Sequence, residues 1–359
     1  MFVLSQTRMK TMDSDELYLL DVGHGNCALI KRGSTAIVID APSKPVLARA
    51  LDELGITEIS SLLISHADAD HLSGGIALIM DESRPVNNIY VNPDPRKSRA
   101  WQEFRQAVRA ARKRGTHIET SLNTNHSGRV SIGATTLTIL HPTPELCLST
   151  VEGVSDQDTK LTANNMSAVV RVDHAGSPVC LLAGDTDLTS LRSMMDDGVD
   201  LSAAVLVFPH HGGNAGGHDN KSFAKELTST VNPELVFFSL GRGVHGTPQP
   251  DIISGVREST GDVEGRVAPY IACTQLSTRC SSKLPDKIDR SLDSRSEGLA
   301  KNYCCAGTIS VDLENASVEG LIGQLKASHS AFVTGHVTSP LCTRLKKQRT
   351  HQEIEAPEC

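Results

Sequence analysis

Four ionisable side chains lie within six residues in the stretch LLISHADADHLSGG, residues 62–75, and they are His66, Asp68, Asp70 and His71. They follow a short apolar run that is typical of a buried strand. Ionisable groups this close together are costly unless water or a metal ion compensates them. On an extended segment residues i and i+2 project to the same side, so the first histidine and aspartate can face one ion. The second aspartate and histidine then follow a tight turn that could open a helix, displaced toward a second ion.

Further candidate ligands come after later apolar segments. Asp185 ends CLLAGD, His210 and His211 end VLVFPHHGG, and His245 lies in GRGVHGTP. Each adjoins a strand-like run and most adjoin glycine, so they are expected in loops at one edge of a sheet, where α/β active sites usually lie. Two adjacent ions held there would polarise a phosphoryl or carbonyl oxygen and generate hydroxide near neutral pH. The pattern therefore indicates a two-metal hydrolytic centre.

The surrounding pattern predicts an α/β protein. KPVLARALDELGI and TSLRSMMDDGV are expected to be helices, and Gly74 and Gly75 are expected to close off the HADADH segment. Short β-forming runs bounded by Gly, Pro, Ser or Asp predict strands. These runs are ELYLLDVG, NCALIKR, TAIVIDA, SLLISH, VSIGATTLTILHP, MSAVVRVD, VCLLAGD, AAVLVFPHH and LVFFSLG.

The motifs LLDVGHGNCALI, IVIDA, LLISHADADHLSGG, NNMSAVVRV, LLAGDTD, VLVFPHHGG and SLGRGVHGTPQP occur in this order over roughly residues 16–260. In this order they resemble the metallo-β-lactamase superfamily, and more closely the ComEC-like hydrolases, the C-terminal metallo-hydrolase domain of the bacterial DNA-uptake channel. The resemblance implies a four-layer αββα sandwich with the metals at one edge of its two sheets.

The resemblance also implies roles for single residues. His66 and Asp68 would bind the first metal, while Asp70, His71 and His210 would serve the second. Asp185 would bridge the two ions, and Asp70 would also orient the nucleophile. His211 and His245 would act in catalysis, and Asp40 would orient the metal-binding loop from outside the ligand set.

Two positions depart from the superfamily pattern. The usual motif is HxHxDH, but its second histidine is Asp68 here. A further histidine, usual ahead of the GD motif, is absent, and Asn164 and Asn165 lie in that region and could leave one metal weakly held. A carboxylate in place of an imidazole favours Mn²⁺ or Mg²⁺ relative to Zn²⁺. Two divalent ions, Mn²⁺ or Zn²⁺ with Mg²⁺ as a further candidate, are the expected cofactors.

Each motif has a simpler interpretation. HADADH alone could be a solvated acidic loop with a helix cap, and His245 could simply lie in a turn. His211 could contact substrate, donate a proton to the leaving group, or only support His210.

The expected substrate is DNA or RNA, because of the DNA-uptake resemblance and a local concentration of positive charge. Residues 96–115 carry eight Lys or Arg against one Glu in a chain of net charge −7. Helical spacing there puts apolar residues on one stripe and Arg105, Arg109 and Arg112 on another, where they could contact phosphates. A solvated basic face is the alternative. A small-molecule hydrolase acting on a cyclic nucleotide or thioester, and a non-catalytic metal-stabilised module that binds nucleic acid or a partner, are the other functions considered.

Composition favours a cytoplasmic protein with no membrane association. No apolar run approaches the ~18 residues of a membrane span, and the N-terminal stretch lacks the apolar core of a signal peptide. Aromatic residues make up 3% of the chain, which disfavours base stacking as its main binding mode.

The C-terminal part has a different character. Residues 1–265 are expected to form the hydrolase domain, residues 266–345 its closing strand AGTISVDL with a cysteine-rich extension, and residues 346–359 a flexible tail. Residues 277–302 are polar and are expected to form an exposed loop. Six of the nine cysteines follow residue 270. A structural zinc could be held by members of the set Cys273, Cys280, Cys304, Cys305 and Cys342, with free buried thiols or a reversible disulfide as alternatives.

Overall fold

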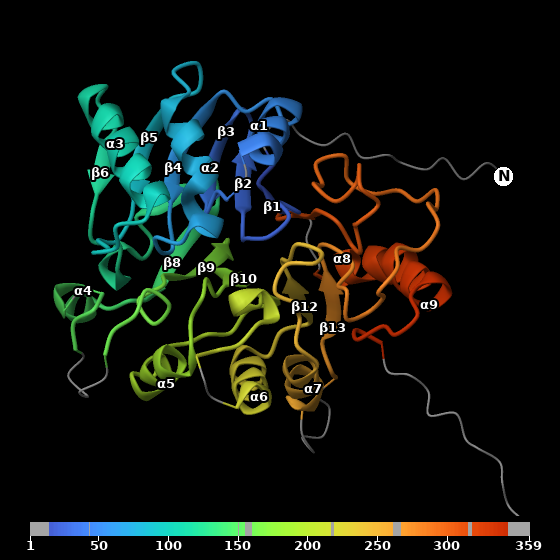
Figure 1. Cartoon of the computed structure of the whole chain (residues 1–359). Helices are drawn as coiled ribbons and strands as arrows, with labels where there is room; N and C mark the ends of the chain where they lie inside the picture. The colour runs from blue at the N-terminus through green and yellow to red at the C-terminus, as the bar shows by residue number, and fades with distance from the viewer. Residues whose placement is uncertain are drawn as a thin grey trace, which may run out of the picture.

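The computed structural model describes residues 14–42, 44–149, 151–154, 160–216, 219–260, 267–314 and 318–343. Within these ranges the chain forms two seven-stranded mixed sheets, which lie between two layers of helices (Figure 1). The expected four-layer αββα sandwich is therefore confirmed. No helix in these ranges has both the length and the apolar character needed to cross a bilayer.

The first sheet is parallel from β3 to β6, and β14, β1 and β2 extend it with antiparallel pairings. Its strands in spatial order are β14 (Ile309–Asp312), β1 (Glu16–Leu19), β2 (Ala28–Arg32), β3 (Thr35–Ile39), β4 (Glu58–Leu63), β5 (Val86–Tyr90) and β6 (His117–Glu119). Its outer face is covered by α1 (Lys44–Glu53), α2 (Ala69–Met80) and α3 (Arg99–Lys113).

The second sheet repeats this plan, with antiparallel pairings from β7 to β10 and parallel ones from β10 to β13. Its strands in spatial order are β13 (Tyr270–Cys273), β12 (Leu235–Phe238), β11 (Val205–Val207), β10 (Ser177–Leu182), β9 (Val169–His174), β8 (Thr135–His141) and β7 (Val130–Ile132). Its outer helices are α5 (Leu188–Asp196), α6 (Asn220–Val231) and α7 (Pro250–Glu258), with α4 (Pro144–Ser149) nearby.

Alternation along each strand divides the apolar residues among three cores. Leu17 and Leu19 of β1 enter the core between the sheets, whereas Tyr18 and Leu20 enter the core beneath α1, α2 and α3. Because successive strand side chains point to opposite faces, a strand buried on both sides must be apolar almost throughout. This is why the β-forming runs in the sequence are continuous rather than alternating.

The start of α2 differs from its sequence-based expectation. Gly74 and Gly75 do not end the HADADH segment but lie inside α2. Their backbone N–H groups both donate to the carbonyl of Ala41, at 2.6 and 3.0 Å, while the N–H of Ala41 donates to the carbonyl of His71. Ala41, two residues after the end of β3, is thus hydrogen-bonded directly to the first turns of the helix.

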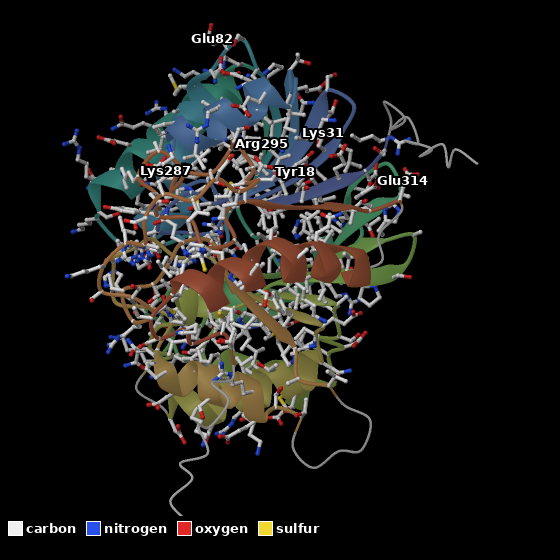
Figure 2. The ribbon with its side chains drawn as sticks, turned by 90° about the vertical axis from the view of Figure 1, so that its right-hand side faces the viewer. Tyr18, Lys31, Glu82, Lys287, Arg295 and Glu314 are labelled. Atoms are coloured by element: carbon white, nitrogen blue, oxygen red, sulfur yellow. The ribbon has the colours of Figure 1, made fainter. Side chains whose placement is uncertain are left out.

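The C-terminal part adds one strand to each sheet, β13 and β14, followed by α8 (Val318–Leu325), a π-helical turn η3 (Lys326–Ser330) and α9 (Ala331–His336). Figure 2 shows these last helices lying across the side of the molecule between the two helical layers. Residues 277–302 have no regular secondary structure, as expected, but Ser277, Cys280 and Ser296 within them are buried. Arg295 lies over the ring of Tyr18, at 4.7 Å (Figure 2). The segment is therefore a loop that is mostly exposed or half-buried, as expected, with a few residues that anchor it to the core. The expected flexible tail, 346–359, lies outside the described residues.

The core beneath α2 and α3 gives a stability prediction. Phe104 of α3 is fully buried and its ring stacks on Trp101 with centroids 5.7 Å apart. Phe104→Ala removes these contacts and leaves a cavity, so we expect a loss of about 3–5 kcal/mol in the free energy of unfolding, measured by urea denaturation. Gln106→Ala, an exposed position on the same helix, is the control, and an equal effect of both substitutions would contradict the packing described here.

Candidate metal centre

The candidate ligands come together at one edge of the sandwich because the strands that carry them end there. Ile39 of β3 pairs with Leu63 of β4, and Leu182 of β10 pairs with Val207 of β11, which pairs in turn with Phe237 of β12. These parallel strands therefore end level with one another within each sheet. The loops that follow them carry Asp40, the 66–71 segment, Asp185, His210 with His211, and His245.

The first of two clusters consists of His66, His71 and Asp185, whose ligand atoms all lie within 4.8 Å of one another. All three side chains are buried. The Nε2 atom of His66 is 3.7 Å from Oδ2 of Asp185, and Nε2 of His71 is 3.5 Å from its Oδ1. Two ligands of one ion bound at about 2.1 Å stand roughly 3–4 Å apart. The spacing of this first cluster therefore suits a single divalent ion.

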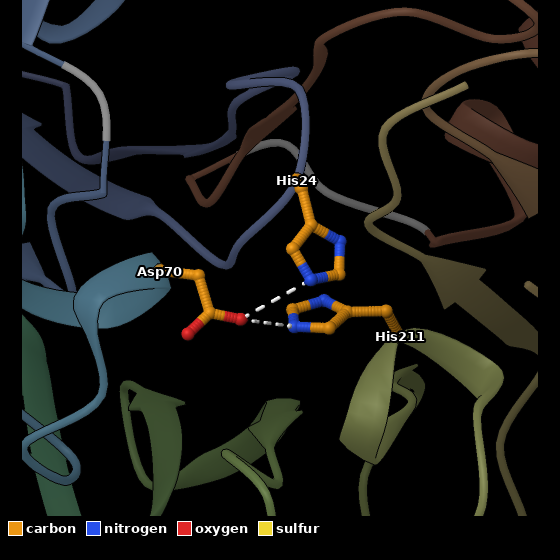
Figure 3. A group of neighbouring side chains, drawn as sticks. All are labelled: His24, Asp70 and His211. Atoms are coloured by element: carbon orange, nitrogen blue, oxygen red, sulfur yellow. Dashed lines mark ion pairs between the residues drawn. The ribbon is translucent and has the colours of Figure 1, made fainter. Parts of the chain in front are cut away.

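The second cluster consists of His24, Asp70 and His211, which meet the same distance criterion. Oδ2 of Asp70 is 3.3 Å from Nε2 of His24 and 3.3 Å from Nε2 of His211. Figure 3 shows the three side chains converging from the loop after β1, the start of α2 and the turn after β11. The rings of His71 and His211 are 5.8 Å apart. The two clusters are thus adjacent, as a two-ion centre requires.

The nitrogens that face inward are those left free by the hydrogen bonds of each ring. Nδ1 of His71 donates to Asp40 at 2.7 Å, and Nδ1 of His211 donates to the carbonyl of Ser239 at 2.8 Å. Nδ1 of His66 contacts the hydroxyls of Ser65 and Ser167. The Nε2 atoms of these three rings are buried and have no hydrogen-bond partner among the described residues. A buried polar atom without a partner is costly. One ion in each cluster would satisfy these three atoms, so the residues present fit metal binding.

Charge and burial act against each other in this pocket. Burial lowers the pKa of His66 to about 4, so its ring is neutral and its lone pair is free. Burial also acts to lower the pKa of His71, but the carboxylates of Asp40 and Asp185 outweigh it and raise the pKa well above its usual value. Burial acts to raise the pKa of Asp70, yet the imidazoles of His211 and His24 hold it far below the usual range. The carboxylates at the site are therefore ionised and available to a cation.

Four residues at the site adopt left-handed backbone conformations that residues other than glycine rarely take. Their φ angles are 56° at Asp40, 52° at His210, 54° at His211 and 51° at His245. Such conformations cost free energy and persist only where surrounding structure imposes them. Asp40, for example, is fixed by the backbone N–H and the hydroxyl of Ser65, which donate to its two carboxylate oxygens at 2.7 and 2.8 Å. The structure thus places Asp40 where it orients both His71 and the metal-binding loop.

The grouping of ligands differs from the sequence-based expectation. Asp70 and His71 were assigned to one ion, but they lie in different clusters because they leave the first turn of α2 in different directions. Asp68 was assigned to the first ion, yet it lies outside both clusters: one carboxylate oxygen is 3.3 Å from Nε2 of His66 and the other accepts from Arg96. His210 adjoins the first cluster, with Nδ1 3.6 Å from Asp185 and a buried, unpartnered Nε2.

Two further predicted residues lie nearby without joining a cluster. His245 is exposed, and its ring is 5.0 Å from that of His24. Asn165 contacts no cluster residue: its side chain bonds Thr162 and Lys160, and its carbonyl accepts from His141. The predicted role of Asn165 beside the metals stays a prediction, and Ser167 is the residue of this segment whose side chain contacts the first cluster. Its hydroxyl contacts His66 and accepts the backbone N–H of Asp185.

Sequence reasoning missed His24. It lies in LLDVGHGNCALI, between two glycines, and that pairing is the signal that could have found it. A Cβ at Gly25 would lie 2.3 Å from the carbonyl oxygen of Asp70, and one at Gly241 would lie 2.7 Å from the backbone nitrogen of His24. Glycine is needed at both places because the His24 loop is held directly against its neighbours.

Asp21 anchors the base of the His24 loop. This fully buried carboxylate accepts hydrogen bonds from the backbone N–H groups of Gly23 and Gly298, at 3.2 and 2.9 Å, and from the side chain of Gln275 at 2.9 Å. The thiol of Cys304 also donates to it. The loop that carries a second-cluster ligand is thus tied to the C-terminal part of the chain.

The predicted structural zinc site does not form among the described residues. Cys304 turns to Asp21, whereas Sγ of Cys305 is 3.1 Å from Nε2 of His329. No three Cys, His, Asp or Glu ligand atoms in this region come within 4.8 Å of one another in the described ranges. Burial raises the pKa of each thiol in the predicted set, Cys273, Cys280, Cys304, Cys305 and Cys342. All five cysteines are free thiols, and all but Cys304 pack among apolar side chains.

Comparison with known proteins agrees with this fold. The family model described as "Metallo-beta-lactamase superfamily" matches residues 20–87, which include His24, Asp40 and the 66–71 segment. Over these residues the chain is similar to that superfamily, whose fold implies binding of divalent metal ions. No curated protein matches the chain.

Three solved structures that match this chain share little sequence with it. Igni18, a metallo hydrolase from the hyperthermophilic archaeon Ignicoccus hospitalis KIN4/I, is 15% identical with a TM-score of 0.41, over 71% of this chain and 94% of that one. YhfI from Bacillus subtilis, a metallo-β-lactamase fold protein, is 13% identical with a TM-score of 0.42, over 72% and 96%. A diphosphatase of the PhnP family is 12% identical with a TM-score of 0.35, over 69% and 81%.

The second cluster gives a prediction for metal content. His24→Ala removes one of its three donors, so we expect the purified variant to retain about one fewer equivalent of divalent metal than the unsubstituted protein, measured by mass spectrometry of the elements after gel filtration. His117→Ala changes an exposed histidine on β6 and should leave the metal content unchanged. Equal metal content in all three proteins would show that His24 is not a ligand.

Proposed function

We propose that this chain is a metal-dependent phosphodiesterase that cuts nucleic acid, DNA or RNA, with two divalent ions held by the two clusters. The observation that carries the proposal is the pair of adjacent clusters, each built from two imidazoles and one carboxylate whose free atoms face one another. Two ions so held activate water as hydroxide and stabilise charge on a phosphoryl oxygen. The superfamily match supports hydrolysis as the type of reaction.

Zn²⁺ and Mn²⁺ are the ions that the donor sets favour. Each cluster offers two nitrogen donors, which suit Zn²⁺, and one carboxylate, which suits Mn²⁺ as well. The sequence argument for a harder, Mg²⁺-like site depended on Asp68 as a ligand. Because Asp68 lies outside both clusters and accepts from Arg96, that argument weakens.

The tautomer of His211 decides between its candidate roles. Its Nδ1 contacts a carbonyl oxygen, which can only accept, so Nδ1 carries the proton of the neutral ring and the lone pair of Nε2 faces the second cluster, 3.3 Å from Asp70. A ring in this state binds a cation rather than donating a proton to a leaving group. We therefore assign His211 to metal binding.

His245 is the residue assigned to the substrate. It is exposed on the side of the second cluster and its ring lies 5.0 Å from His24. With no cluster carboxylate in contact, its imidazole can reach a bound phosphodiester and protonate the leaving oxygen.

The basic helix α3 supports nucleic acid as the substrate. Arg96 contacts Asp68 beside the first cluster, and α3 begins three residues later at Arg99. A helix of fifteen residues is about 22 Å long, so α3 leads from the site across the surface. Arg105, Arg109 and Arg112 are exposed along it, while Trp101 and Phe104 face the core. Arginines in such a row can contact successive phosphates of one strand.

Activity measurements test the proposal directly. Purified protein is assayed with Mn²⁺, Zn²⁺ and Mg²⁺ against linear, circular and single-stranded DNA, RNA, a small phosphodiester and a thioester. We expect metal-dependent cleavage of nucleic acid, and its loss by at least 100-fold in both Asp70→Ala and His71→Ala, because each removes one cluster's ligand. Hydrolysis of the thioester alone, or binding of DNA without turnover under every ion, would refute the proposal in favour of the other two functions.

The role of α3 is tested by the salt dependence of DNA binding. The logarithm of the affinity falls as the logarithm of the salt concentration rises. Replacing Arg105, Arg109 and Arg112 simultaneously by Ala should make this negative slope shallower by about 2–3. The same triple variant should hydrolyse a small phosphodiester at the unsubstituted rate, because that substrate is too short to reach along the helix. An unchanged salt slope would mean that α3 is only a solvated basic face.

A further inference from the structure

The ion pair between Asp68 and Arg96 joins the metal centre to the segment before α3. Oδ2 of Asp68 is 3.3 Å from Nε2 of His66, a first-cluster residue, and Oδ1 accepts a hydrogen bond from Nη1 of Arg96. One carboxylate thus separates the guanidinium from the first cluster. Among the ion pairs of the described residues, Arg96 is the arginine that reaches the metal centre, through the Asp68 carboxylate beside the first cluster.

Arg96 is held in place from its other side by Asp94. The backbone N–H of Arg96 donates to Oδ1 of Asp94 at 2.7 Å, and its Nε is 2.9 Å from the same carboxylate. The Asp94 side chain is only 3% exposed, and the carbonyl of Asp94 accepts from the indole of Trp101 at 2.9 Å. Since Trp101 is buried beneath α3, the guanidinium is fixed to the hydrophobic core.

The Arg96 side chain still reaches solvent beside the site, although its Nη2 atom is buried. The side chains of Arg96 and Asp68 are 32% and 31% exposed. An ion pair exposed to this extent contributes little to stability, so another anion can share or replace Asp68 as acceptor at small cost. Nε of Arg96 is engaged by Asp94, so Nη1, which contacts Asp68, is the donor that a phosphate oxygen can reach through a charge-assisted hydrogen bond.

We propose that Arg96 binds the phosphate group of the substrate at the first cluster and so selects phosphate esters over uncharged esters. The inference rests on the proposed phosphodiesterase function and names the residue that recognises its anionic substrate. The carboxylates of Asp68, Asp70 and Asp185 lie around the centre, and a fixed cation outside the pair of metal ions would help to hold an anionic group there. Arg96 supplies that cation, already oriented by Asp94.

Arg99 provides a matched control three residues away. It carries the same charge, but its side chain is 91% exposed and pairs with Glu103 on its own helix. It therefore lacks both the anchoring by Asp94 and the contact with the site. Arg96→Gln and Arg99→Gln change the net charge equally, and Arg96→Lys keeps the charge while removing the guanidinium.

Two measurements on the metal-loaded protein test Arg96. The first is hydrolysis of a small anionic phosphodiester: Arg96→Gln should raise KM about tenfold or more with a smaller change in kcat, Arg96→Lys should recover part of this, and Arg99→Gln should match the unsubstituted protein. The second is calorimetric binding of inorganic phosphate, which should weaken by a similar factor in Arg96→Gln alone. Metal content and thermal stability are measured for every variant.

The outcomes separate this inference from the proposed function. If the unsubstituted protein hydrolyses no phosphodiester under any ion, the proposed function fails, and phosphate binding still tests Arg96. If Arg96→Gln behaves as Arg99→Gln does in both measurements, the inference is overturned. It is also overturned if Arg96→Gln loses metal or stability and Arg96→Lys restores them, because the ion pair would then be structural.

Discussion

The structure depends on one electrostatic constraint, which is that imidazoles and carboxylates are gathered out of water at a single edge of the sandwich. His66, His71 and Asp185 are all buried, and the Nε2 atoms of both histidines lack hydrogen-bond partners among the described residues. Removing such groups from water is costly without compensation. The carboxylates of Asp185 and Asp70, one in each cluster, offset part of this cost, and a pair of cations would offset the rest. Contacts with the surrounding residues hold these side chains in place.

Two features hold the ligands in place: the backbone conformation, and the hydrogen bonds made by the ring nitrogens that face away from the clusters. Asp40, His210 and His211 adopt left-handed conformations, which a chain free to relax would leave. Asp40 orients His71, and the carbonyl of Ser239 orients His211. Each contact fixes which ring nitrogen carries the proton, so the opposite nitrogen is available to a cation. The level ends of β3, β4, β10, β11 and β12 bring these pieces together.

The sequence was informative where a residue's role depended on its near neighbours. Apolar runs buried on both faces predicted the strands, and HADADH after such a run predicted the centre. The errors involve partners far apart in the chain. Asp68 stays a predicted ligand, with one oxygen 3.3 Å from His66, but its contact with Arg96, 28 residues later, could not be read from the local spacing. His24 was missed because only the fold brings it to Asp70 and His211. For the cysteines, composition suggested zinc, but Cys304 contacts Asp21, 283 residues away, instead of other thiols.

The same contact shows why the C-terminal part belongs to the site. Asp21 can hold the His24 loop only because Gln275, Gly298 and Cys304 supply donors to its buried carboxylate. Burial raises the pKa of Asp21, and these hydrogen bonds act in the opposite direction by stabilising its ionised form. Without them an ionised carboxylate at this position would favour moving to water and would draw the loop with it. The position of His24 in the second cluster therefore depends on a segment about 250 residues further along the chain. The residues of that segment that bond Asp21 support the site without binding a metal themselves.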